Sequence, residues 1–129
     1  MNADRAINME QKPAASDLWP ELLKNLLAQN SDLLSEDALS RILEFYEIVL
    51  KENEVQNLTR LTSPEDFYQS HVRDVLELLK INRIQFPALD LGSGVGIPGL
   101  LAALIQPGAW ILAESEKRKA EYLEKAVNI

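Results

Sequence analysis

The sequence contains no cysteine and a single histidine, His71. Without cysteine there can be no disulfide bond, thiolate nucleophile or thiolate zinc ligand, and one histidine excludes a histidine-rich metal site. No window reaches the roughly 18 apolar residues that a membrane span requires, and nothing near Met1 resembles the charged start and apolar run of a secretory signal. We therefore expect a cytoplasmic protein with no membrane segment and no metal.

Basic residues are also outnumbered, since 13 Lys and Arg stand against 20 Asp and Glu and the net charge is −7. Residues 1–55 hold 11 acidic and 5 basic side chains, whereas residues 56–129 hold 9 and 8, so the acidity belongs to the front part. The one dense basic run is Lys117-Arg118-Lys119. It allows a local phosphate contact, and it equally fits a solvated helix face on which the cations neighbour Glu121 and Glu124.

Three segments repeat apolar residues at the spacing of an amphipathic helix. Ser35 can cap the second helix and Ser63 the third, because acidic residues follow each serine in the first helical turn. Pro64 suits the first helical position of the third. The predicted helices cover residues 18–27, 36–54 and 64–80. The expected apolar face of the second helix comprises Leu39, Ile42, Leu43, Tyr46, Val49 and Leu50.

After residue 82 short apolar strands alternate with helices. Such alternation predicts parallel strands joined by a right-handed crossover, which is how a doubly wound sheet begins. The expected order is a strand at 86–91, a helix at 98–105, a strand at 110–114 and a helix at 116–127. Residues 1–15 carry no apolar period, so we expect a disordered tail there.

The loop after the first strand reads Asp90-Leu91-Gly92-Ser93-Gly94-Val95-Gly96. With Gly99 it satisfies the dinucleotide fingerprint, but that match alone is weak. A dinucleotide places an anionic pyrophosphate on helix amides, and the carboxylate of Asp90 would repel it. S-adenosylmethionine carries an ammonium and a sulfonium, which that carboxylate attracts, and glycines let the backbone approach the cofactor. We predict an S-adenosylmethionine pocket, with a nicotinamide-dependent oxidoreductase fragment as the alternative.

Glu114 at the end of the second strand strengthens this prediction. An acid at that position can accept hydrogen bonds from both ribose hydroxyls of an adenosine cofactor. A phosphate-binding P-loop is excluded, because no Gly-Lys-Ser or Gly-Lys-Thr follows the glycines. A remaining alternative is that the glycine loop is only a tight turn before a helix in an unrelated α/β protein, and such a turn would need no ligand. Gly99 is expected to serve close packing, and Pro98 to start the helix.

Several segments together resemble one family. They are Asn57-Leu58-Thr59-Arg60, His71 with Asp74, and Leu89-Asp90-Leu91-Gly92-Ser93-Gly94-Val95-Gly96-Ile97-Pro98-Gly99-Leu100. From about Leu39 to Ile129 the sequence is similar to the ribosomal RNA small-subunit methyltransferase G family, also called the glucose-inhibited division B proteins. Val75 stands where that family usually has Ser, and Leu101 replaces a frequent Pro, so packing near these positions is expected to differ.

The resemblance implies an α/β fold. A helical N-terminal subdomain at 16–82 would be followed, at 83–129, by the start of a Rossmann-like S-adenosylmethionine-dependent methyltransferase domain with an incomplete parallel sheet. The implied reaction is methyl transfer to N7 of a guanosine in 16S rRNA of the small ribosomal subunit. Because N7 carries a free lone pair, no general base is required, and catalysis would rest on positioning.

The resemblance also assigns roles to single residues. Lys117 and Arg118 match a Lys-Arg pair and are the candidate RNA contacts, while His71 is expected to support the cofactor loop through Asp74 or the backbone. No residue is predicted to be catalytic. The expected cofactor-binding residues are Asp90, Gly92, Ser93, Gly94, Gly96, Ile97 and Glu114.

Two parallel strands leave sheet edges open, which favours self-association or pairing with a complementing chain. We therefore expect a truncated product or fragment that presents the cofactor loop but is inactive alone. The competing hypothesis is a noncatalytic interaction module, in which the acidic N-terminal helices bind a protein partner and the glycine loop is a relic.

Overall fold

The structure is a computed structural model that describes residues 15–29 and 34–129. The tail expected over residues 1–15 therefore lies, except for its last residue, outside the described residues. The predicted helices are confirmed, and none in the described part is long and apolar enough to cross a membrane. Among the described residues up to Lys80, the helical segments are η1 (Ala15–Leu18), α2 (Trp19–Ala28), α3 (Glu36–Glu52), α4 (Pro64–Phe67), η2 (Tyr68–Val72) and α5 (Arg73–Lys80).

Two serines start helices as their positions predict. Ser35 Oγ accepts a hydrogen bond from the Ala38 amide at 3.1 Å, and Ser63 Oγ accepts one from the Asp66 amide at 3.2 Å. Both side chains satisfy amides that would otherwise lack a partner at a helix start. The third predicted helix is not uniform, because the π-helical turn η2 separates α4 from α5. No apolar period or cap marks such a turn in sequence.

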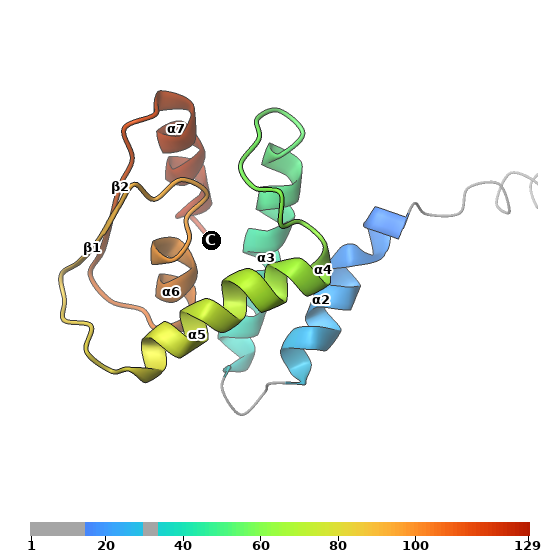
Figure 1. Cartoon of the computed structure of the whole chain (residues 1–129), viewed down its shortest axis with the longest axis horizontal. Helices are drawn as coiled ribbons and strands as arrows, with labels where there is room; N and C mark the ends of the chain where they lie inside the picture. Colours follow the sequence, from blue (N-terminus) through green and yellow to red (C-terminus); the bar gives the residue numbers. More distant parts are fainter. Residues whose placement is uncertain (1–14, 30–33) are drawn as a thin grey trace, which may run out of the picture.

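Two short strands form a parallel sheet. Strand β1 (Ala88–Leu91) pairs with β2 (Trp110–Ala113), with Ala88 opposite Trp110 and Leu91 opposite Ala113. Helix α6 (Gly99–Ile105) connects the strands, and α7 (Lys117–Ala126) follows β2, so the predicted alternation is confirmed. Figure 1 shows α6 and α7 between the strands and α3. The sheet is thus attached to the helical part through these two helices.

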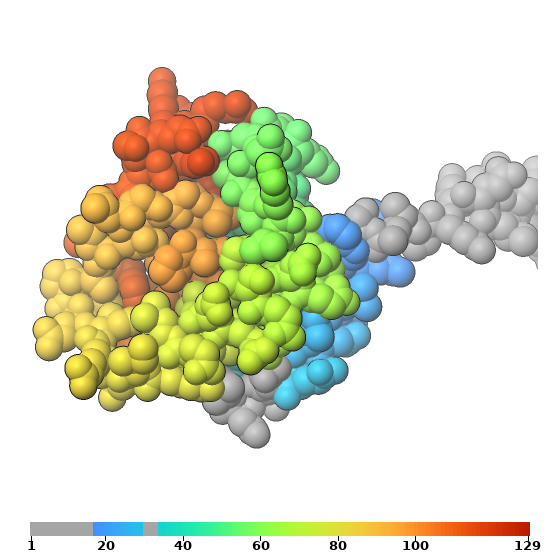
Figure 2. Space-filling view, viewed as in Figure 1, coloured from blue at the N-terminus to red at the C-terminus, as the bar shows by residue number. Residues whose placement is uncertain are grey.

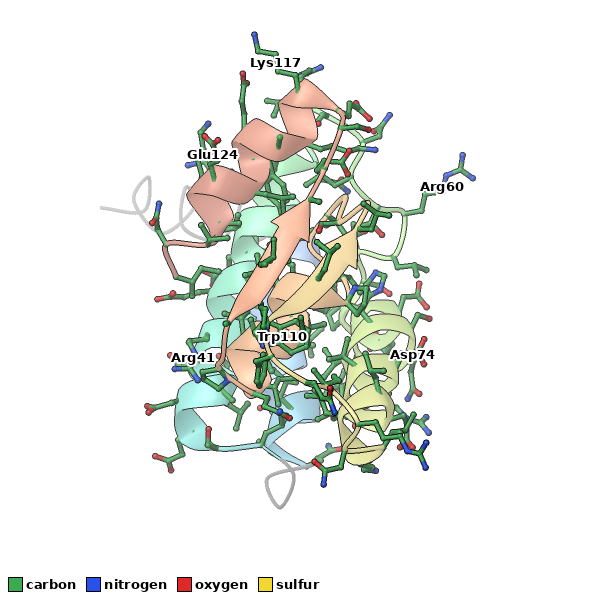
Figure 3. All side chains as sticks on the ribbon, turned by 90° about the vertical axis from the view of Figure 1, so that its left-hand side faces the viewer. Arg41, Arg60, Asp74, Trp110, Lys117 and Glu124 are labelled. Atoms are coloured by element: carbon green, nitrogen blue, oxygen red, sulfur yellow. The ribbon has the colours of Figure 1, made fainter. Side chains whose placement is uncertain are left out.

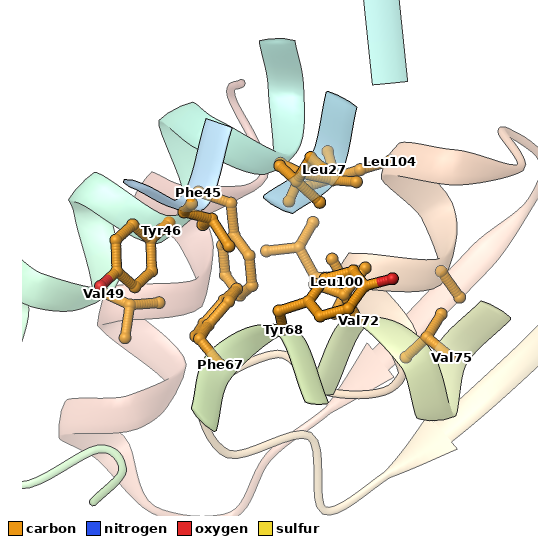
Figure 4. Close-up of a cluster of buried hydrophobic side chains, with 14 of the residues drawn as sticks. Leu27, Phe45, Tyr46, Val49, Phe67, Tyr68, Val72, Val75, Leu100 and Leu104 are labelled. Atoms are coloured by element: carbon orange, nitrogen blue, oxygen red, sulfur yellow. The ribbon is translucent and has the colours of Figure 1, made fainter. Parts of the chain in front are cut away.

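The buried side chains form one continuous core across the helices and the sheet. At its centre the ring of Phe67 packs edge-on against Tyr46, with ring centroids 4.7 Å apart, and at 6.2 Å from Phe45 (Figure 4). Phe45 is fully buried, although the expected face of its helix omitted it. The six expected residues are all buried or pack against the core, and Phe45 is added because α3 packs against α2 on one side and α6 on another. The buried residues of α3 are Ala38, Ile42, Phe45, Tyr46 and Val49.

The two faces of the sheet differ. Helix α6 covers one face so closely that a Cβ at Gly99 would lie 2.6 Å from Leu112 Cδ2, which confirms Gly99 as a close-packing glycine. The other face exposes 61% of Leu89, 81% of Leu91 and 50% of Ile111. Association of another chain with this sheet stays a prediction.

The two positions at which the sequence departs from the family pattern both lie in the core. Val75 on α5 and Leu101 on α6 are buried. Both side chains belong to the apolar core, so these two positions affect packing.

Replacing Phe67 with Ala should lower the free energy of unfolding by about 3 to 5 kcal/mol, because it removes the ring that joins α3 to α4 and leaves a cavity. Urea denaturation followed by circular dichroism measures this. The control is Ile81→Ala, at a side chain that is 61% exposed, where the change should stay within about 0.5 kcal/mol. Equal losses in the two variants would contradict the central position of Phe67.

Candidate functional site

The turn between β1 and α6 is fixed to the neighbouring strand. The amides of Gly92 and Ser93 both donate to the Ala113 carbonyl, at 2.7 and 3.0 Å. Ser93 is buried, and its hydroxyl donates to the Asp90 carbonyl at 2.9 Å. Gly92 has φ +77°, a left-handed conformation that residues with a Cβ rarely adopt. The turn is therefore held in one conformation by bonds that its own chain supplies.

The glycine loop, residues 92–97, has an open part and a packed part. A Cβ at Gly92 or Gly94 would meet nothing within 4 Å, whereas one at Gly96 would lie 3.0 Å from Leu100 Cβ. Ile97 also packs against the core. In Figure 2 the yellow-orange residues after β1 lie at the surface between the red α7 and the green segment after α3. Of the predicted glycines, Gly92 and Gly94 thus present accessible backbone and Gly96 does not.

The carboxylate of Glu114 joins the glycine loop to the start of α7. Its Oε1 accepts from the Gly94 amide at 2.7 Å, and its Oε2 accepts from the Glu116 amide at 2.8 Å. The hydrogen bond from Glu116, followed by that from Gly94, lowers the pKa of Glu114 below its ordinary value of 4.5. The group is ionised at neutral pH, and each oxygen keeps a further acceptor position for a hydroxyl.

Asp90 faces α6. Its Oδ2 accepts from the Gly99 amide at 3.0 Å, and a Cβ at Gly99 would come within 2.6 Å of that oxygen. A carboxylate is favourable at a helix start, where amides without intrahelical partners point outward. In the dinucleotide interpretation a pyrophosphate would need these amides. Asp90 already binds one of them, which disfavours the nicotinamide alternative.

Sequence reasoning missed Tyr122. This fully buried ring on α7 places its hydroxyl 2.8 Å from the Val95 carbonyl, to which it donates. Burial, together with the negative charge of Glu52, raises the pKa of Tyr122, so the hydroxyl stays protonated and able to donate. A single aromatic residue within a Lys- and Glu-rich helix was the available signal for such a contact.

His71 contacts the loop between α3 and α4. Its Nε2 lies 3.5 Å from Thr59 Oγ1, and its ring stands edge-on to Phe67 with centroids 5.3 Å apart. Burial lowers the pKa of His71 below its ordinary value of 6.5, against the opposing charge of Asp74. The side-chain partner found for His71 is thus Thr59, within the Asn-Leu-Thr segment.

The basic run divides into three environments. Lys119 Nζ pairs with Glu116, the residue before α7, at 3.2 Å. Arg118 Nη2 donates to the Val55 carbonyl at 3.0 Å. Lys117 is exposed at the start of α7 and extends into solvent (Figure 3). Of the two candidate RNA contacts, Lys117 has its charged group turned outward and Arg118 binds a neighbouring loop.

Comparison with known proteins identifies related sequences. A sequence model of the family described as rRNA small subunit methyltransferase G matches residues 38–129. A ribosomal RNA small subunit methyltransferase G of Trichodesmium erythraeum is 33% identical, over 91% of this chain and 46% of the relative. A ribosomal RNA small subunit methyltransferase G 2 of Bdellovibrio bacteriovorus is 31% identical, over 85% of this chain and 42% of the relative. The chain spans about half the length of the curated relatives it matches. No solved structure matches it significantly.

Replacing Glu114 with Gln should change how stability depends on pH. Because its folded-state pKa is lowered, the carboxylate contributes stability that is fully present above 4.5 and is lost as pH falls through the folded value. Urea midpoints measured from neutral to acidic pH should therefore fall more steeply for the wild type than for Glu114→Gln. Glu124→Gln, which changes an exposed acid on α7, is the matched control. Parallel curves for wild type and Glu114→Gln would contradict the assigned bonds.

Proposed function

Since this chain belongs to the rRNA small subunit methyltransferase G family, we propose that it provides the S-adenosylmethionine site of a methyltransferase acting on RNA of the small ribosomal subunit. The observation that carries this proposal is the open backbone at Gly92 and Gly94 beside the ionised carboxylate of Glu114. Both lie at the carboxyl ends of neighbouring parallel strands, where open α/β sheets bind ligands.

The residues present fit this cofactor. Glu114 keeps acceptor positions for the ribose hydroxyls after binding two amides, and the backbone at Gly92 and Gly94 can be approached without a side chain in the way. Asp90 would supply negative charge that attracts the ammonium and sulfonium of the cofactor. When bound, S-adenosylmethionine supplies an activated methyl group. Ser93 supports the loop through its buried hydroxyl, so we assign its side chain no direct contact with the cofactor.

The methyl acceptor implied by the resemblance is guanine N7 in 16S rRNA. Its free lone pair needs no proton removed, so the chain has to orient the two reactants without deprotonating one. Well-oriented reactants can lower a barrier by roughly 7 to 11 kcal/mol. His71 is half-buried against Thr59 and Phe67, and in this proposal its role is to maintain the shape of the site. Lys117 at its rim is the proposed RNA contact, and the proposed place of action is the cytoplasm, where ribosomes assemble.

Titration calorimetry with S-adenosylmethionine tests the proposal on the 129-residue chain. We expect one-to-one binding by the wild type and affinity about 10- to 100-fold lower for Glu114→Gln, because a hydrogen bond to a charged group contributes about 1.5 to 3 kcal/mol. Glu124→Gln should bind as the wild type does. Circular dichroism of each variant checks that the fold is retained.

Three outcomes would count against the proposal. An absence of heat with wild type and with Asp90→Ala would support the relic loop of a noncatalytic interaction module. Stronger binding of NADH than of S-adenosylhomocysteine would support the oxidoreductase fragment. Equal affinities for Glu114→Gln and Glu124→Gln would remove Glu114 from the site.

A further inference from the structure

The loop between α3 and α4, residues 53–62, is held in shape by side-chain hydrogen bonds, three of which involve Asn53. Asn53 Nδ2 donates to the Thr59 carbonyl at 2.9 Å, while Asn53 Oδ1 accepts from the amides of Leu58 and Thr59 at 2.8 and 3.2 Å. Thr59 Oγ1 accepts from the Leu61 amide at 3.1 Å. The backbone on both sides of Arg60 is therefore fixed, and the direction in which Arg60 leaves the loop is fixed with it.

The same loop is joined to the start of α7. Arg118 Nη2 donates to the Val55 carbonyl at 3.0 Å, and Gln56 Nε2 donates to the Arg118 carbonyl at 3.3 Å. Glu114 in turn ties this start of α7 to the glycine loop. Residues 53–62, the N-terminal turn of α7 and the glycine loop thus form one connected surface at the carboxyl end of the sheet.

Arg60 and Lys117 are the outward cations of that surface. Both are exposed, and Figure 3 shows both side chains extending into solvent at the end toward which the strand arrows point. In residues 15–29 and 34–129 the ion pairs found are Lys80 with Glu77 and Lys119 with Glu116, so neither Arg60 nor Lys117 has a carboxylate within 4.0 Å. An exposed guanidinium on a loop whose backbone is fixed by hydrogen bonds is suited to bind an external anion.

We infer that Arg60 binds a backbone phosphate of a single-stranded RNA, and that Lys117 binds a second phosphate of the same strand. This rests on the proposed function, in which RNA is the methyl acceptor. Guanine N7 lies in the major groove, which is deep and narrow in an RNA helix, so an unpaired strand presents this atom more readily. Single strands are held through cations that follow the backbone. Arg60 and Lys117 border the surface that contains Gly92, Gly94 and Glu114, so phosphate contacts there bring a base to the glycine loop.

Lys117 and Arg118, which are adjacent in the basic run, have different roles. Arg118 is engaged with Val55 and holds residues 53–62 against α7, which makes it a positioning residue. Arg60 takes over the phosphate contact that the run alone would have suggested for Arg118. The RNA-binding surface is therefore made from residues nearly 60 positions apart in the sequence and cannot be found from a basic cluster.

Fluorescence anisotropy with a short fluorescein-labelled single-stranded RNA tests this over a series of KCl concentrations. For each phosphate that a variant no longer binds, the slope of log K against log salt should decrease in magnitude by about 0.7. We expect that decrease for Arg60→Gln and for Lys117→Gln, and about twice that decrease for the double variant. The matched control is Arg83→Gln, which removes one exposed arginine ahead of β1, at the opposite end of the sheet, and should leave the slope unchanged.

Two results would overturn the inference: an Arg60→Gln slope equal to that of Arg83→Gln, or no salt-dependent RNA binding by the wild type. Calorimetry with S-adenosylmethionine on the same samples separates its failure from that of the proposed function. If cofactor binds but Arg60→Gln matches the control, only the RNA contact is wrong. If Arg60→Gln lowers the slope and cofactor does not bind, only the cofactor site is wrong. Equal thermal midpoints for Arg60→Gln and Arg83→Gln exclude unfolding as the cause.

Discussion

The carboxylate of Glu114 binds the amide of Gly94 on one side and that of Glu116 on the other, and the rest of the site depends on this pair of bonds. Two parallel strands in register place the loops that follow them at the same edge of the sheet, where the amides of Gly94 and Glu116 find their acceptor in a side chain instead of a strand. A buried or half-buried amide without an acceptor costs free energy. One ionised side chain satisfies an amide of each loop, and in doing so sets the separation between the glycine loop and α7.

From α7 the connections continue into the helical part of the chain. Tyr122 donates to Val95 in the glycine loop, and Arg118 donates to Val55 in the loop after α3. The aromatic contacts around Phe67 then join that part into one core. A two-stranded sheet has little stability of its own, so its carboxyl end is shaped by helices that precede it in the sequence. The helical segment is accordingly part of the proposed binding surface as well as its support.

Local features of the fold could be predicted, whereas the partners of charged side chains could not. Ser35 and Ser63 were identified as caps because acidic residues follow each serine in the first helical turn, and each hydroxyl bonds an amide three residues on. Gly99 was identified as a packing glycine from its place in a strand-loop-helix segment. Glu114 was assigned to a ribose on its position at a strand end, but its bonds to Gly94 and Glu116 require knowledge of how both loops lie. No sequence pattern predicted the π-helical turn η2.

By itself the sequence determined the order of helices and parallel strands, the starts of two helices and the position of the glycine loop, since these follow from backbone sterics and hydrogen bonds within a few residues. The tertiary structure alone decided that Phe45 enters the core, that Gly96 packs inward while Gly92 stays open, and that Arg118 holds a loop while Arg60 faces solvent. These outcomes depend on which surfaces come into contact between segments that are about 60 residues apart in the sequence. Which side chains are buried and which polar groups find partners is decided where these distant segments meet, and no local sequence pattern relates such segments to one another.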